Sequence, residues 1–287
     1  MVQSNWGTWF INDEVEAVDP DGLSIWYLGC NGFILRTKST TVYIDPYFGS
    51  GTAPETIRML PIPMAPTDAT MCDAVLVTHE HIDHMHPPSY GPLVETLEAD
   101  LYAPKAAYDK PDYDGDMLIS DDQKHVIEVG DHVTIGDLTV NVREANDPDA
   151  IEPVSYVVEH TSGTFFHAGD SRPADAFKDL AREFDIDLGA LALGTVGNVY
   201  KLDSNTAETT DWYNDENQII EAANALGLTR LLPSHYDMWK GVGADPKVLH
   251  EHARSYEYPR SIEIVEIGDR LEINKSGVIP PTMFQSV

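Results

Sequence analysis

Short apolar runs separated by turn residues recur along most of the chain, and they predict strands. The first group covers residues 23–28, 33–36, 41–45, 74–77 and part of 101–108. The second group covers residues 125–128, 132–135, 138–143, 154–159, 164–168, 187–193, 230–233, 261–266 and 270–273, and we expect residues 125–143 to open a second sheet region. Helical periodicity marks residues 87–98, 173–184, 215–226 and 246–256. Strands followed by helices, twice over, fit an αββα sandwich, and no linker divides the chain. We therefore expect an α/β fold in a single domain spanning residues 1–287.

Three segments lie outside these elements. Residues 1–23 form a polar N-terminal arm with aromatic islands, and we favour its docking on a neighbouring subunit over its packing on the chain's own core. Residues 46–72 are rich in Pro and Met, and a connection of this length predicts a lid or binding loop. Residues 195–213 are expected to form a further loop.

The charge excludes several partners. With 48 acidic and 18 basic residues among 287, the formal net charge is −30, which repels phosphate backbones and anionic lipid heads. The acidic residues are spread along the chain instead of forming one block, so we interpret them as an adaptation to high salt. We expect a protein from a salt-loving organism, with no nucleic-acid partner.

The cysteine count and the hydropathy indicate a cytoplasmic protein. Only Cys30 and Cys72 are present, too few for a disulfide framework, and we expect Cys30 to be a core residue and not a ligand. No apolar run reaches the length of a membrane span, and the N-terminus lacks a signal-type apolar segment. No membrane association is expected.

The densest chemistry follows the predicted strand at residues 74–77. There the sequence His79-Glu80-His81-Ile82-Asp83-His84 places three histidines and an aspartate within six residues. Alternate residues of an extended segment point the same way, so His79 and His81 can face one ion while the following turn directs Asp83 and His84 to a second. Imidazole and carboxylate are ligands for Zn, Mn and Fe, and we interpret the motif as a metal site over the alternative of surface histidines.

This His-x-His-x-Asp-His pattern resembles the metallo-β-lactamase superfamily, which implies a four-layer αββα sandwich with a two-metal cleft. Further stretches resemble the L-ascorbate-6-phosphate lactonase family: residues 6–9 (WGTW), 26–32 (WYLGCNG), 167–171 (HAGDS), 235–239 (HYDMW) and 244–246 (ADP). That resemblance covers nearly the whole chain. It implies a cytoplasmic, metal-dependent lactonase that assembles as a homo-oligomer, with a hexamer as the candidate size.

The resemblance assigns seven positions to metal ligands: His79, His81, Asp83, His84, Asp147, Asp170 and His235. His79 and His81 would hold the first ion and Asp83, His84 and His235 the second, with Asp170 as the bridge. Many superfamily members have a histidine where this chain has Asn146 and Asp147; Asp147 is our candidate there, and a turn without metal is the alternative. An oxygen ligand shifts the site toward Mn, so we expect one or two divalent ions, Mn or Zn. Asp45 would orient the histidines from behind the ligands.

The expected reaction is attack of a metal-held hydroxide on the carbonyl of a lactone, with Asp83 and Asp170 as the catalytic carboxylates. His167 is expected to pack or to support the ligands. Six residues are candidates for binding the substrate: Arg58, Arg172, Asn198, Lys201, Tyr236 and Trp239. Because Lys and Arg are scarce, we favour a plain sugar lactone, such as a pentonolactone, over an ascorbate-6-phosphate-like lactone.

Three other functions share parts of this pattern. A metal-dependent phosphodiesterase would use the same ligands, although the charge of −30 argues against nucleic acid as its substrate. A redox di-iron protein would usually need a glutamate in the central motif, where this chain has Asp83. A non-catalytic scaffold is disfavoured because buried, unpaired His and Asp are costly unless they are used.

Overall fold

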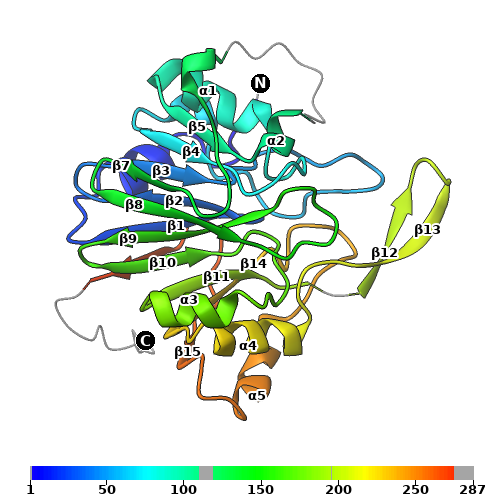
Figure 1. The fold of residues 1–287 in the computed structure, drawn as a ribbon. Helices are drawn as coiled ribbons and strands as arrows, with labels where there is room; N and C mark the ends of the chain where they lie inside the picture. The colour runs from blue at the N-terminus through cyan, green and yellow to red at the C-terminus, as the bar shows by residue number, and fades with distance from the viewer. Residues whose placement is uncertain (1, 110–118, 195, 275–287) are drawn as a thin grey trace, which may run out of the picture.

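Two large β-sheets packed face to face form the centre of the computed structural model, which describes residues 2–109, 119–194 and 196–274 (Figure 1). Within these residues each sheet has seven strands. The first sheet has the order β16-β1-β2-β3-β4-β5-β6. Its strands are β1 (Leu23–Gly29), β2 (Gly32–Arg36), β3 (Thr41–Ile44), β4 (Ala74–Leu76), β5 (Asp100–Ala103), β6 (Lys124–Val126) and β16 (Arg270–Ile273).

The second sheet has the order β15-β14-β11-β10-β9-β8-β7. Its strands are β7 (His132–Ile135), β8 (Leu138–Glu144), β9 (Val154–His160), β10 (Gly163–His167), β11 (Leu188–Ala192), β14 (Arg230–Ser234) and β15 (Ser261–Ile262). In both sheets an antiparallel half joins a parallel half: β3 to β6 run parallel, as do β10, β11, β14 and β15.

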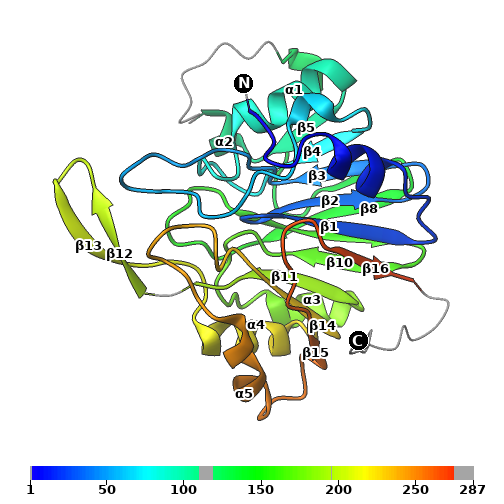
Figure 2. The same ribbon diagram turned by 180° about the vertical axis from the view of Figure 1, so that it is seen from behind.

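Helices cover the outer face of each sheet (Figures 1 and 2). On the first sheet lie η1 (Phe10–Glu16), α1 (Pro87–Leu97) and α2 (Lys105–Asp109). On the second lie α3 (Phe177–Glu183), α4 (Glu216–Ala225) and α5 (Leu249–Ala253). Short 3-10 turns are η2 (Pro66–Asp68), η3 (Asp121–Gln123) and η4 (Pro246–Val248). The predicted four-layer αββα sandwich is confirmed.

The strand side chains show why four layers form. In β1, Leu23, Ile25 and Tyr27 pack between the sheets, whereas Trp26 and Leu28 pack under the helices of the first sheet. All seven residues of β1 are buried, as expected for a strand covered on both faces. A strand buried on both faces has a continuous apolar run in place of a polar-apolar alternation. Such runs are easy to recognise as strands in the sequence.

The predicted elements differ from the structure in a few places. The segment 101–108 holds a strand and then the helix α2, not a strand and a turn. The strand expected at 125–128 in the second sheet region is β6, which pairs in parallel with β5 at the edge of the first sheet. The helix expected at 246–256 is divided into η4 and α5, and the strand expected at 261–266 is only β15. The loop expected at 195–213 contains the antiparallel hairpin β12 (Val196–Lys201) and β13 (Thr206–Asp211), which projects from the sandwich (Figure 1). Most of its residues are exposed, so no apolar alternation marked them as strands.

The N-terminal arm packs on the chain's own core. Phe10, Ile11 and Val15 are fully buried against the first sheet, which corrects the expectation that the arm's apolar side chains serve a neighbouring subunit. Trp9 remains half exposed. The arm also holds the long loop 46–72, since Asn5 donates its N–H to Ile62 O and accepts one from Ile62 N.

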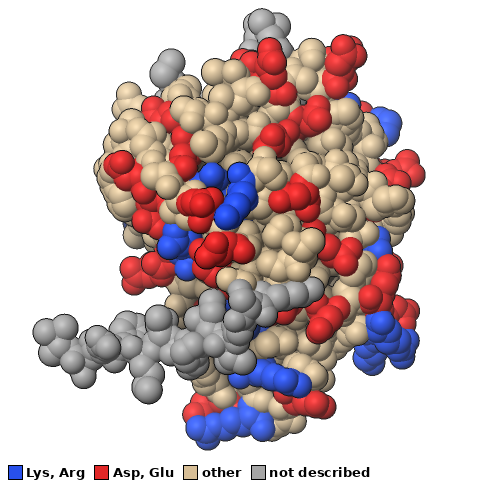
Figure 3. Space-filling view, turned by 90° about the vertical axis from the view of Figure 1, so that its left-hand side faces the viewer, with Lys and Arg blue, Asp and Glu red and all other residues tan. Residues whose placement is uncertain are grey.

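Acidic side chains are scattered over the face shown in Figure 3 and do not gather in one patch, in keeping with their spread along the sequence. Within the described part of the chain, no helix has both the length and the apolar character required to cross a membrane.

Candidate metal centre

The seven predicted ligands meet at one edge of the sandwich, because each follows the C-terminal end of a strand. The segment His79–His84 follows β4, Asp170 follows β10, and His235 follows β14. Asp147 lies in the loop after β8. Carboxyl ends of parallel strands gather at the same edge of a sheet, and the two sheets bring their edges together here.

A first group of donors combines His79, His81, Asp147 and Asp170. His79 Nε2 lies 2.9 Å from His81 Nδ1, 3.6 Å from Asp147 Oδ2 and 3.8 Å from Asp170 Oδ2. Atoms bound about 2.1 Å from one ion lie roughly 3.0–3.5 Å apart at octahedral or tetrahedral angles. The three distances lie within about 0.3 Å of that interval, so the four side chains can close on a single ion, and Asp147 lies among them.

A second group, which combines His84, Asp170 and His235, shares Asp170 with the first. His84 Nε2 is 3.2 Å from Asp170 Oδ2, and His235 Nε2 is 3.9 Å from Asp170 Oδ1. Asp83 Oδ2 is 3.2 Å from His235 Nε2. Asp170 Oδ2 thus lies near a histidine of each group, His79 and His84, while Oδ1 faces His235, so this carboxylate is shared by both groups.

The unpartnered atoms of the centre test whether a metal fits. His84 Nε2 and Asp147 Oδ2 are buried, and neither has a hydrogen-bond partner within the described residues. Their nearest polar neighbours are other donor atoms of the centre: His84 Nε2 lies 3.2 Å from Asp170 Oδ2, and Asp147 Oδ2 lies 3.6 Å from His79 Nε2. Both atoms point into the donor groups, so a divalent cation would satisfy each of them. The residues present fit such an ion.

Polar side chains behind the ligands fix their orientation. Asp45 is fully buried; it accepts hydrogen bonds from Thr78 N at 2.8 Å and Thr78 Oγ1 at 2.6 Å, and its Oδ2 lies 2.8 Å from His84 Nδ1. Asp45 therefore contacts His84 on the ring nitrogen opposite the one that faces Asp170, and its orienting role stays a prediction. Asn31 donates to Asp170 Oδ1 at 3.1 Å, and its carbonyl lies 2.9 Å from Nε2 of the buried His167. His167 therefore supports the centre from behind, as expected.

Backbone strain concentrates at the same edge. Among the described non-glycine residues, six have positive φ, and four of these belong to the centre: Cys30 (57°), Asp45 (43°), Tyr213 (61°) and His235 (64°). Such conformations cost on the order of 1–3 kcal/mol each and persist where the surrounding structure imposes them. The strained backbone at these four residues orients their side chains at the centre.

The protonation states of the metal-free centre follow from burial and charge. Burial lowers the pKa of His84, but the charges of Asp170 and Asp45 outweigh it and raise that pKa well above 6.5. Burial and the charge of His84 lower the pKa of His79 to about 3. Burial and the charge of Asp170 raise the pKa of Asp147 to about 6. The metal-free centre therefore holds protons on His84 and, below about pH 6, on Asp147.

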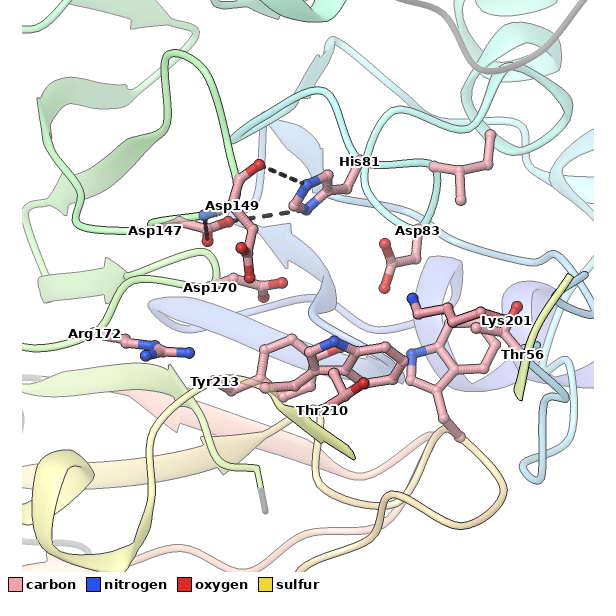
Figure 4. Close-up of a pocket in the computed structure, with 13 residues that line it drawn as sticks. Thr56, His81, Asp83, Asp147, Asp149, Asp170, Arg172, Lys201, Thr210 and Tyr213 are labelled. Carbon is pink, nitrogen blue, oxygen red and sulfur yellow. Dashed lines mark hydrogen bonds and ion pairs between the residues drawn. The ribbon is translucent and has the colours of Figure 1, made fainter. Parts of the chain in front are cut away.

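A pocket of about 490 Å³ opens onto the centre (Figure 4). Among its lining residues are four predicted ligands: His81, Asp83, Asp147 and Asp170. Arg172 and Lys201 lie on opposite sides of it, with Tyr213 between them (Figure 4). Trp212 and Trp239 add two further aromatic side chains to the lining. The pocket can hold a small polar molecule against the donor groups.

Of the six predicted substrate residues, Arg172, Lys201 and Trp239 line the pocket, and the other three do not. The guanidinium of Arg58 donates to the carbonyls of Leu60, Tyr47, Gly49 and Pro61. These four bonds use four of the five N–H groups of Arg58, so this side chain braces the loop 46–72.

The remaining two predicted substrate residues also have other contacts. The Tyr236 hydroxyl donates to Val265 O at 2.9 Å inside the helix-side core. Asn198 is exposed on β12, and its Oδ1 accepts from Thr209 Oγ1.

Sequence reasoning missed several residues of the site. Tyr213 stacks on His235 with ring centroids 4.1 Å apart, and it follows the hairpin that was expected to be a loop. Cys30, expected in the core, has its Sγ 3.2 Å from His235 Nε2. Cys30 and Asn31 lie in the family-resembling stretch 26–32, but no metal-ligand spacing in the sequence pointed to either residue.

Comparisons with known proteins agree with this geometry. The model of the β-lactamase superfamily domain matches residues 40–236. A probable L-ascorbate-6-phosphate lactonase of Escherichia fergusonii is 26% identical over 290 residues, covering 85% of this chain and 78% of that protein.

Two solved structures resemble the fold. Igni18, a metallo hydrolase of Ignicoccus hospitalis, superposes with a TM-score of 0.66 at 16% identity, over 87% of this chain and 97% of that one. The metallo-β-lactamase fold protein YhfI of Bacillus subtilis superposes with a TM-score of 0.61 at 15% identity, over 88% of this chain and 99% of that one. Together with the donor groups at the sheet edge, the domain match shows that the chain belongs to the metallo-β-lactamase superfamily, as a metal-dependent hydrolase with sequence relatives among the L-ascorbate-6-phosphate lactonases.

Proposed function

We propose that the protein is a metal-dependent lactonase that opens the ring of a sugar-acid lactone with one or two Mn or Zn ions. The observation that carries this proposal is the meeting of two donor groups at Asp170, beside a pocket of about 490 Å³. The similarity to L-ascorbate-6-phosphate lactonases over most of the chain supports the choice of a lactone.

Asp83 and Asp170 have separate roles in the proposed reaction. Bound ions supply a polarised lactone carbonyl and a water of lowered pKa. Burial raises the pKa of Asp83, but its hydrogen bond to His235 and the charge of His84 outweigh this and keep the carboxylate ionised. Asp83 lines the pocket, so we assign this carboxylate to take the proton that the attacking water gives up and to pass it to the ring oxygen as the ester bond breaks. Asp170 is held by Asn31 and fixes the two donor groups relative to each other.

The pocket lining supports a sugar as the substrate. The aromatic faces of Tyr213 and Trp239 offer apolar contact for sugar C–H groups, and Thr210 offers a hydroxyl. Arg172 donates one hydrogen bond to Asp211 O, and Lys201 lines the opposite side. Two bases in so acidic a chain favour a lactone that carries an anionic group. Their presence weakens the sequence-based preference for a plain lactone.

The same two bases favour the second candidate, a phosphodiesterase, because Arg172 and Lys201 could hold a phosphate diester in the pocket. We rank it below the lactonase because the net charge of −30 repels polyanionic substrates.

A substrate panel tests the proposal. Metal-stripped protein in molar KCl receives Mn or Zn, and acid release is followed on plain and phosphorylated sugar lactones, with bis-p-nitrophenyl phosphate alongside. We expect metal-dependent ring opening. Lys201→Ala should raise the KM for phosphorylated lactones with little effect on the KM for plain ones. Lys240→Ala is the matched control, because Lys240 is exposed and lies outside the pocket lining. Diester hydrolysis well above lactone hydrolysis would establish the phosphodiesterase instead.

A further inference from the structure

Cys30 lies among the donors of the second group, although neither the motif nor the family resemblance marks it as a ligand. It occupies the turn between β1 and β2 and is fully buried. Its Sγ lies 3.2 Å from His235 Nε2 and 3.6 Å from Asp83 Oδ2, and these two atoms are 3.2 Å apart. The three donors therefore form a nearly equilateral triangle.

The size of this triangle fits three ligands of one ion. A sulfur about 2.3 Å and a nitrogen or oxygen about 2.0–2.1 Å from zinc lie roughly 3.1 Å apart at a right angle and roughly 3.6 Å apart at a tetrahedral angle. Both distances from Cys30 Sγ fall within that interval. The nitrogen–oxygen edge, at 3.2 Å, falls within the corresponding interval of roughly 2.9–3.4 Å.

The backbone around Cys30 is built to aim the thiol. Cys30 has φ of 57°, a left-handed conformation that a non-glycine residue adopts only under constraint. The Tyr27 hydroxyl donates to Cys30 O at 3.0 Å and accepts the N–H of His235 at 3.3 Å. One buried tyrosine thus ties the turn that carries Cys30 to the loop that carries His235.

We propose that the Cys30 thiolate is a further ligand of the second ion, beside Asp83 and His235, which makes this position a mixed N/O/S site. On binding, the thiol gives up its proton to solvent and the sulfur bonds to the cation. Thiolate is a soft ligand, so this position prefers Zn or Co over Mn, whereas the first position, with two histidines and two carboxylates, accepts Mn as well. The inference concerns the metal centre and does not depend on which ester the protein hydrolyses.

X-ray absorption on the full-length protein tests this directly. Zinc-loaded wild type, with two ions confirmed by metal analysis, should show a sulfur shell at about 2.3 Å. Cobalt-loaded protein should show a thiolate-to-cobalt charge-transfer band. Both signals should disappear in Cys30→Ser, and the affinity for the second zinc equivalent should fall by at least about tenfold.

Cys72→Ser is the matched control. Cys72 is the chain's other cysteine; it is buried in the cluster on the helix side of the first sheet, and its Sγ donates to Ala74 O. This variant keeps Cys30 as its sole thiol and should retain both signals, so the test stands even where Cys30→Ser fails to fold.

Two results would overturn the inference: two bound zinc ions without a sulfur shell in the wild type, or a shell that persists in folded Cys30→Ser. Either would leave the proposed lactonase untouched, whereas a protein that binds no metal would overturn both.

Discussion

Asp45→Asn is the sharpest test of how the chain presents His84 to a metal. The wild-type carboxylate faces three donors: Thr78 N, Thr78 Oγ1 and, at 2.8 Å, His84 Nδ1. Asparagine has one acceptor oxygen. If that oxygen stays opposite Thr78 N, the amide NH₂ takes the position of Oδ2 and faces His84 Nδ1. His84 must then carry its proton on Nε2, the atom that faces Asp170 at 3.2 Å and is needed for the metal.

The expected magnitude follows from these contacts. Loss of a buried group that orients a metal ligand typically costs 10–100-fold in metal affinity, or about 1.4–2.8 kcal/mol. In the metal-free protein, an unsatisfied buried donor costs about 1–3 kcal/mol of stability. For a chain of this size that corresponds to a fall in Tm of several degrees, on the order of 2–4 °C per kcal/mol.

Calorimetric titration of metal-stripped protein with Zn measures the affinity, and thermal unfolding measures the stability. Asp137→Asn is the control, because Asp137 also accepts two hydroxyl hydrogen bonds, from Thr37 and Thr40, but lies on the surface away from the centre. We expect it to bind metal like the wild type. Wild-type affinity for both ions in Asp45→Asn would refute the assignment of Asp45.

Three further outcomes follow from the charges. The folded-state pKa of Asp147 is raised to about 6, so this group lowers the stability of the metal-free protein as the pH rises from about 4 to 6. The free energy of unfolding, measured across that range, should show this loss. Asp147→Asn should remove the contribution of this group to the pH dependence. Metal binding at neutral pH should release a proton from His84, whose pKa is raised well above 6.5, and titrations in buffers of different ionisation enthalpy count it. Because the net charge is −30 and the Debye length falls from about 10 Å at 0.1 M to about 3 Å at 1 M salt, molar KCl should raise the Tm; an unchanged or lower Tm contradicts the salt adaptation.

The sequence predicted best where burial and chemistry coincide. Strands covered on both faces, such as β1 and β11, are continuous apolar runs in the sequence. The motif His79–His84 follows the buried strand β4, and its donors stand together in the sequence. Asp170 and His235 were found only through family resemblance, since each stands alone in sequence. Long-range contacts are what the sequence hides: Cys30 and His235 are 205 positions apart, and no spacing rule joins them.

The errors also have physical causes. The exposed hairpin β12–β13 lacks an apolar face, so its strands and the neighbouring Tyr213 escaped notice. Arg58 was the only base in its loop, yet backbone carbonyls accept from four of its five N–H groups, which a sequence cannot reveal. The cytoplasmic location, the homo-oligomer and the closing motion of residues 46–72 stay predictions.

The most direct test of the central claim is a reconstitution titration. Metal-stripped protein in molar KCl receives Zn or Mn in fractions of an equivalent, and both bound metal and the rate of sugar-lactone opening are measured on the same samples. We expect no activity without metal and a rate of lactone opening that rises with metal occupancy up to two equivalents. Asp170→Asn should not reach the wild-type rate. Lactone opening that is independent of metal, or full occupancy of both positions without any lactone opening, would contradict the account.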